Sequence, residues 1–290
     1  MTESVAVHPR TKTQLGQLAA APSHAIAFVG PDGIGKGLVA RQAIAQMLHI
    51  EPGALAHYAY FSHIGPDGAS ISIEAVRSVR QFLRLKTTGE QTLRRAVLIE
   101  HAEALTTEAQ NALLKMLEEP PADTVIALTT ANVRALLPTI ASRVQLFTVH
   151  EPGEAAVRAQ FAALAASDAA LAQAYFLSGG LPGLMHALLA GGDGHPLAAS
   201  VATAKDLLRQ STFERLAQVD RLGKEKDETA HVLEALARIA QAGLNQAAAR
   251  QNAAQLKQWH HILKETHAAR QALATGANTK ITLTNLMLQL

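Results

Sequence analysis

Residues 25–37 read AIAFVGPDGIGKG, a short apolar run that leads into a glycine-rich turn. The apolar run, Ala25–Val29, is typical of a buried strand. From Lys36 to about Leu48 the apolar residues recur at helical spacing, so the turn is predicted to join a strand to a helix. This unit decides the fold class, because a strand before and a helix after are the context in which such turns hold phosphate groups.

The turn fits the phosphate-binding pattern G-x-x-x-x-G-K, and the positions concerned are Gly30, Gly33, Gly35, Lys36 and Gly37. Glycines let backbone N–H groups wrap phosphates, the lysine reaches their outer oxygens, and the helix N-terminus adds a positive partial charge. The next residue should be Ser or Thr, whose hydroxyl holds magnesium, but here it is Gly37. Two interpretations stay open: residual nucleotide binding, or an inherited loop that binds nothing.

Further strands and helices alternate on either side of this unit. Strands are predicted at Ala59–Ser62, Ala96–Ile99, Val125–Thr129 and Val144–Val149, and helices at Ile73–Leu85 and from Thr106 or Thr107 to Pro120. Strands separated by helices predict an α/β domain with a mostly parallel sheet. Beyond a boundary at Glu151–Gly153 the strand pattern ends, and only helices are predicted, with a second boundary at Gly191–Pro196.

Composition excludes several classes of protein. Lys+Arg 26 against Asp+Glu 24 gives a net charge of +2, which excludes a polycation that binds nucleic acid by bulk charge. The absence of cysteine excludes disulfides, thiol catalysis and thiolate zinc sites, and is consistent with a cytoplasmic protein. No run approaches the roughly 18 apolar residues of a membrane span. Aromatic residues make up 4%, which disfavours a surface that stacks nucleic-acid bases.

The residues after the predicted strand Ala96–Ile99 are Glu100, His101 and Glu103. An active P-loop ATPase of this type needs an aspartate for magnesium and then a glutamate that orients water. Glu100 can bind a metal, although its side chain differs in length from that of the expected aspartate. His101 stands where the carboxylate base is expected. Together with Gly37, these changes argue against efficient hydrolysis. The alternative interpretation of Glu100 and Glu103 is a solvated strand end.

The block Glu108–Pro121 reads EAQNALLKMLEEPP, and it is followed by Thr129-Thr130 and by LPTIASR at Leu137–Arg143. In these residues the chain resembles the bacterial clamp-loader family, a branch of the AAA+ ATPases. The resemblance runs from about His8 to His150, weakens over 151–196 and returns faintly at Asn278–Leu290. It implies a RecA-like P-loop domain over 1–150, a small helical lid over 151–195, and an all-α collar for oligomerisation over 196–290.

The resemblance also implies roles for individual residues. The glycine-rich turn matches Walker A, Glu100 to Glu103 match Walker B, and Thr130 lies near the sensor-1 position. Ser142-Arg143 matches the family's Ser-Arg-Cys motif, with Val144 in place of cysteine, and in the family that arginine points into the ATP site of the neighbouring subunit. From the residues alone, a capping or salt-bridging arginine beside the fifth strand is the alternative for Arg143.

Two features of the family are absent. No arginine lies near Gly183–Met185, where the sensor-2 arginine is expected. The family's four-cysteine zinc module is missing near residues 50–65, and His57 and His63 do not replace it. We therefore expect no metal site and no zinc, and we regard bound ATP and magnesium as doubtful.

The resemblance implies a stator subunit of the DNA polymerase III clamp loader, which helps to load the sliding clamp onto primed DNA and donates Arg143 to a neighbour. Its partners are then gamma/tau-like and delta-like subunits in a hetero-pentamer, the sliding clamp, and primed DNA through the complex. The alternatives are an ATP-hydrolysing gamma/tau-type motor subunit and a non-catalytic AAA+-derived scaffold outside the clamp loader.

Three arginines, Arg77, Arg80 and Arg84, recur at near-helical spacing in the predicted helix Ile73–Leu85. They are candidates for contacts to DNA phosphates in the central channel of the ring. A solvated basic helix face explains the same spacing.

Overall fold

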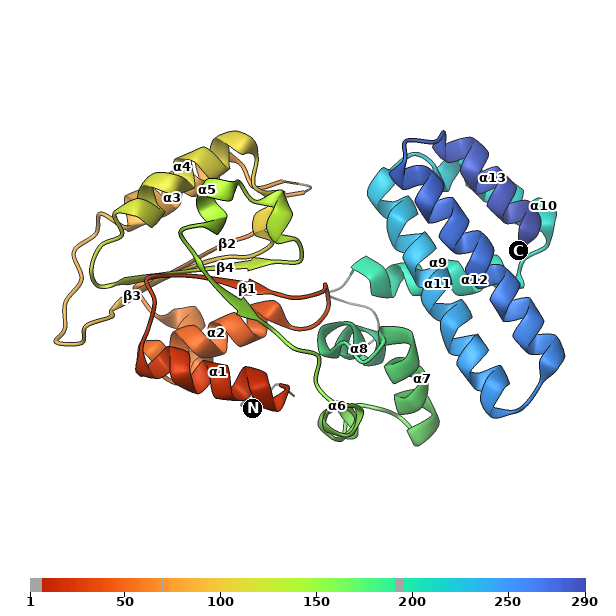
Figure 1. Cartoon of the computed structure of the whole chain (residues 1–290), viewed down its shortest axis with the longest axis horizontal. Coiled ribbons are helices and arrows are strands. Elements are labelled where there is room, and N and C mark those ends of the chain that lie inside the picture. Colours follow the sequence, from red (N-terminus) through yellow and green to blue (C-terminus); the bar gives the residue numbers. More distant parts are fainter. Residues whose placement is uncertain (1–6, 69, 191–195) are drawn as a thin grey trace. The chain divides into compact units, whose positions relative to one another are not determined.

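The computed structural model describes residues 7–68, 70–190 and 196–290 (Figure 1). The chain divides into two compact units, Met1–Ala156 and Val157–Leu290. The first unit contains the sheet and the second is helical. Of the predicted boundary at Gly191–Pro196, residues 191–195 lie outside the described residues, and Pro196 begins a helix.

A parallel sheet with strand order β2-β3-β4-β1-β5 forms the centre of the first unit. Its strands are β1 (Ala25–Val29), β2 (Phe61–Ile64), β3 (Arg95–Ile99), β4 (Thr124–Thr130) and β5 (Gln145–Thr148). This confirms the predicted α/β class. The second strand starts two residues later than predicted, because the N–H of Phe61 donates to the carbonyl of Tyr58 and closes a turn there.

Helices cover both faces of this sheet, with α3 (Ile73–Phe82) and α4 (Thr107–Glu118) on one face and α1 (Pro9–Ala20) and α2 (Lys36–Met47) on the other (Figure 1). The remaining short helices of this unit are η1 (Pro52–His57), η2 (Ala102–Ala104), η3 (Val133–Ala135) and α5 (Pro138–Ala141). The hydroxyl of Thr106 caps α4 by accepting from the N–H of Ala109 at 3.2 Å, and α4 ends before Pro120 as predicted.

The helices after β5 are α6 (Glu154–Phe161), α7 (Asp168–Ser178), α8 (Pro182–Leu189), α9 (Pro196–Arg209), α10 (Thr212–Leu222), α11 (Lys226–Ala249), α12 (Ala253–Ala274) and α13 (Thr279–Gln289). In the second unit α11 packs against α9, α12 and α7, and α13 packs against α10 and α12. The division into separate lid and collar domains stays a prediction. Among the described residues, no helix combines the length and the apolar character needed to cross a membrane.

Arg95, the first residue of β3, is a buried cation that the sequence analysis did not single out; its side chain is 3% exposed. Its guanidinium donates to the carbonyls of Phe82, Leu83 and Leu85, where α3 ends, and lies 3.7 Å from the carboxylate of Asp123. The carbonyl of Phe82 also accepts from the N–H of Leu85. The guanidinium binds all three carbonyls at the end of α3 and so fixes this end to the sheet.

Replacing Arg95 with methionine keeps most of the side-chain volume but removes every donor. We expect Arg95→Met to lower the free energy of unfolding by about 3 kcal/mol, because buried acceptors and a nearby carboxylate lose their partner. Chemical denaturation measures this, with Arg84→Met at an exposed position as the control, expected within about 0.5 kcal/mol of wild type. Equal stabilities for the two variants would contradict this role.

Candidate functional site

The glycine-rich turn between β1 and α2 holds its own lysine. Gly33 and Gly35 have φ of 82° and 95°, a left-handed backbone that glycine adopts without strain, and α2 begins directly afterwards at Lys36. The Lys36 side chain is 6% exposed, and its Nζ donates to Asp32 Oδ1 at 2.9 Å and to the carbonyl of Pro31 at 3.2 Å. The cation that a P-loop offers to phosphate is therefore paired inside the loop.

Glu100, which directly follows β3, reaches over the first turn of α2. Its Oε2 lies 3.0 Å from His63 Nε2, and its Oε1 accepts from Arg41 Nη2 at 3.5 Å. A Cβ added to Gly37 would lie 2.3 Å from Glu100 Oε1. Burial alone would raise the pKa of Glu100, but the hydrogen bond with His63 and the charge of Arg41 hold it below its ordinary value. The carboxylate is thus kept ionised.

A second charged pair joins His101 to Glu103. His101 has a left-handed backbone, its N–H donates to Thr129 Oγ1 at 3.0 Å, and its Nδ1 lies 3.6 Å from Glu103 Oε1. Burial would raise the pKa of Glu103, but bonds from His101, Thr130 and backbone N–H groups, including that of Ala131, lower it to about 2. The same carboxylate raises the pKa of His101. The pair thus favours the protonated imidazole at the position where the sequence analysis expects a carboxylate that orients water.

The side chains of this pocket do not match those that hold magnesium in P-loop ATPases. Gly37 offers no hydroxyl, and Glu100 is engaged by two partners of its own. Three other side chains each offer a ligand atom within 4.8 Å of one another: Asp32, His101 and Glu103. The first of these is already paired with Lys36, and the other two are paired with each other. The glycine-rich turn thus joins a strand to a helix as a P-loop does, while Lys36, Glu100 and His101 are each paired with another residue of the chain.

Arg143 lies at the surface after α5, with its side chain 37% exposed. Its Nη2 lies 2.8 Å from Glu118 Oε1, and its Nη1 donates to the carbonyl of Thr139 at 3.0 Å and to Ser142 Oγ at 3.4 Å. The salt bridge expected under the alternative interpretation is therefore present. An exposed pair of this kind contributes about 1 kcal/mol at most, so an incoming anion can replace Glu118.

The three candidate DNA-binding arginines are exposed along α3 and just beyond its end: Arg77, Arg80 and Arg84. Arg77 also lies 3.7 Å from Glu74 of the same helix, an exposed pair. The opposite face of α3 packs into the core through Val76 and Val79. All three cations are thus available to solvent on one side of the first unit.

At the positions where the resemblance places a zinc module and the sensor-2 arginine, this chain has other residues. His57 ends η1, and His63 bonds Glu100, a contact that the sequence analysis did not foresee. Gly183–Met185 lies in α8, where Leu184 and Met185 are buried. In the second unit Arg238 donates to the carbonyl of Ser178 at 2.8 Å and so caps the end of α7.

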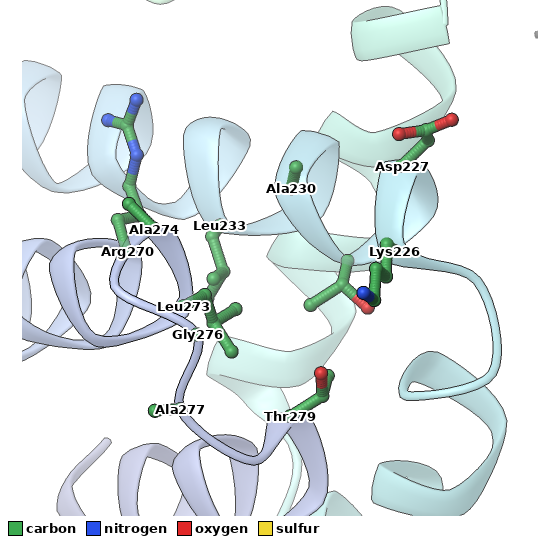
Figure 2. Close-up of a pocket in the computed structure, with 11 residues that line it drawn as sticks. Lys226, Asp227, Ala230, Leu233, Arg270, Leu273, Ala274, Gly276, Ala277 and Thr279 are labelled. Carbon is green, nitrogen blue, oxygen red and sulfur yellow. The ribbon is translucent and has the colours of Figure 1, made fainter.

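A pocket of about 410 Å³ lies in the second unit, between the start of α11, the end of α12 and the start of α13 (Figure 2). Leu233 and Leu273 line its apolar part, while Lys226 and Asp227 lie at the start of α11. Arg270 is paired with Glu234 at 2.7 Å. None of the predicted site residues lines this pocket, so its position does not bear on the phosphate-loop chemistry.

The chain is similar to subunits of DNA polymerase III. The model of the family described as "DNA polymerase III, delta subunit" matches residues 9–152. The DNA polymerase III subunit delta' of Pseudomonas aeruginosa is 34% identical over 226 residues, which cover 70% of this chain and 68% of the relative. The subunit delta' of Bacillus subtilis is 32% identical over 136 residues, which cover 42% of this chain and 41% of the relative. The subunit delta' of Escherichia coli is 37% identical over 123 residues, which cover 42% of this chain and 36% of the relative.

Among solved structures, a DNA polymerase III gamma subunit-related protein of Thermotoga maritima has a TM-score of 0.53 at 21% identity. The match covers 95% of this chain and 97% of that chain. At this identity the likeness concerns the fold alone, and it confirms the expected fold class of a P-loop α/β domain followed by helices.

The contribution of the pair of His101 and Glu103 to the stability of the fold depends on pH. Because the pKa of His101 is raised in the folded chain, the pair stabilises the fold below pH 6.5, and this contribution is lost as the pH rises through the raised pKa. On the acid side, the contribution of Glu103 is lost as the pH falls from 4.5 towards 2.

We expect Glu103→Gln to return the pKa of His101 towards its ordinary value of 6.5, because the carboxylate that raises it is gone. An NMR titration of the His101 ring measures this, with Glu90→Gln, at an exposed loop position, as the control. An unchanged His101 pKa in the Glu103→Gln variant would show that the pair is not formed in solution.

Proposed function

The chain belongs to the DNA polymerase III delta-prime family, and on this premise we propose that it is the non-hydrolysing stator of a clamp loader. In this role it helps to place the sliding clamp on primed DNA and presents Arg143 to the ATP site of a neighbouring subunit. The proposed ring is a hetero-pentamer with gamma/tau-like and delta-like subunits, and it acts in the cytoplasm.

One contrast carries this proposal. The chain's own phosphate pocket has its lysine, its strand-end glutamate and its imidazole paired with other residues of the chain. Arg143, by contrast, lies at the surface, since its side chain is 37% exposed against 6% for Lys36. An arginine presented in trans neutralises charge that develops on a transferred phosphoryl group. This combination favours a subunit that assists hydrolysis in the ATP site of its neighbour over one that hydrolyses ATP itself.

Primed DNA is proposed to contact Arg77, Arg80 and Arg84, three exposed arginines on α3 and just beyond its end. Helix α3 itself lies beside α4 (Figure 1). Each phosphate contact releases counterions and so steepens the salt dependence of binding. Reversing the charge of all three is expected to lower that slope by about 3 in the assembled complex. An unchanged slope would remove DNA contact from the proposal.

Replacing Arg143 with alanine tests the trans role directly. Arginine fingers raise hydrolysis by about 10³–10⁵-fold in GTPases, so Arg143→Ala is expected to slow single-turnover hydrolysis at the adjoining site by about 10³-fold. Assembly of the ring, followed by light scattering, should be unchanged. The matched control is Arg134→Ala, which removes another exposed arginine of the same unit, on η3, and should keep full activity.

Three results would overturn the proposal. Full DNA-stimulated turnover by the Arg143→Ala complex would exclude the trans role. Substantial ATP turnover by the purified chain alone would favour a gamma/tau-type motor instead. A pull-down that recovers no clamp-loader subunits would favour a scaffold outside the ring.

A further inference from the structure

Gly37 is the second residue of α2, a position where glycine destabilises a helix relative to alanine. Its φ is not positive, so the backbone does not require glycine there. The requirement is one of space, because an added Cβ would lie 2.3 Å from Oε1 and 3.1 Å from Cδ of Glu100. The carboxyl group of Glu100 therefore occupies the volume that any other side chain at position 37 would need.

The carboxyl group is anchored there from two directions. His63, at 3.0 Å, belongs to β2, and Arg41, at 3.5 Å, belongs to α2 one turn beyond Gly37. The Glu100 side chain is only 23% exposed, so moving it away from Gly37 would break both contacts with little water to replace them. Its position above Gly37 is therefore set by the surrounding fold.

In P-loop ATPases a Ser or Thr hydroxyl from the loop and a strand-end aspartate hold magnesium together. Here glutamate is one methylene longer than aspartate, and glycine lacks the whole side chain. The two differences are complementary, because the extra length of one carries its carboxylate into the space left by the other.

We propose that Gly37 and Glu100 form a matched pair that closes the magnesium position of this P-loop and excludes the ion. The carboxylate, with Arg41 and His63 as its cationic and hydrogen-bonding partners, stands in place of a metal and its ligands. Any nucleotide that reaches Lys36 is then bound without help from magnesium. This inference goes beyond the proposed role of Arg143 and does not depend on it.

The matched pair predicts that changing either residue alone does not create a magnesium site, whereas changing both does. The probe is a fluorescent ATP analogue, titrated into the purified chain with and without magnesium. For wild type, Gly37→Thr and Glu100→Asp we expect affinities that magnesium leaves unchanged. For Gly37→Thr combined with Glu100→Asp we expect magnesium to tighten binding by at least about tenfold, because hydroxyl and shortened carboxylate then share one site.

A double-mutant cycle that measures melting temperatures tests the proposal even if a variant used for nucleotide binding misfolds. Gly37→Ala should lower the melting temperature, because its methyl group meets the anchored carboxylate. The matched control is Gly16→Ala in α1, where nothing lies within 4 Å of the added Cβ and a rise of about 2 °C is expected. The loss caused by Gly37→Ala should disappear in the Glu100→Asp background, a coupling that only contacting residues show.

Three outcomes would overturn the proposal. The first is magnesium-dependent nucleotide binding by wild type or by Gly37→Thr alone. The second is a folded double variant that gains no response to magnesium. The third is a Gly37→Ala variant whose melting temperature rises as that of Gly16→Ala does. All of these measurements use the chain without ring partners, so they leave the proposed function of Arg143 to its own test.

Discussion

The Glu100 carboxylate occupies the space that a Cβ at Gly37 would need, and the other contacts around the glycine-rich turn depend on this constraint. It fixes the end of β3 against the start of α2 and draws His63 and Arg41 to the same carboxylate. The other charges of the pocket are arranged in the same way, since Lys36 pairs within its loop. A pocket whose charges already satisfy one another gains less from a triphosphate and its metal than a pocket with free charges.

The strand order places the glycine-rich turn and Arg143 at different parts of the first unit. In a parallel sheet the carboxyl ends of the strands lie along one edge, so β1, β3 and β4 bring the glycine-rich turn, Glu100 and Thr130 together. Strand β5 is at the border of the sheet, and Arg143 lies two residues before its start. The glycine-rich turn and the arginine therefore lie on different parts of the same domain.

Periodicity and turn chemistry predicted much of this fold, because they depend on residues close together in the chain. The strand Ala25–Val29, the cap at Thr106 and the stop before Pro120 are of this kind. The contacts that define the site were not predictable in this way. His63, an exposed residue, bonds a glutamate 37 positions away, and Arg95 reaches the end of α3. Only the folded sheet brings such side chains together, and the pattern of apolar residues does not encode their partners.

We propose that Arg143 of this chain contacts the triphosphate bound to a neighbouring subunit, while the chain's own P-loop holds no metal. The most direct measurement is a cryo-EM structure of the reconstituted clamp loader with magnesium and a non-hydrolysable ATP analogue. We expect the guanidinium of Arg143 to have left Glu118 for the γ-phosphate of the adjoining subunit, with no magnesium beside Gly37. An Arg143 still bound to Glu118 and far from every phosphate, or a magnesium ion in this chain's own pocket, would contradict the claim.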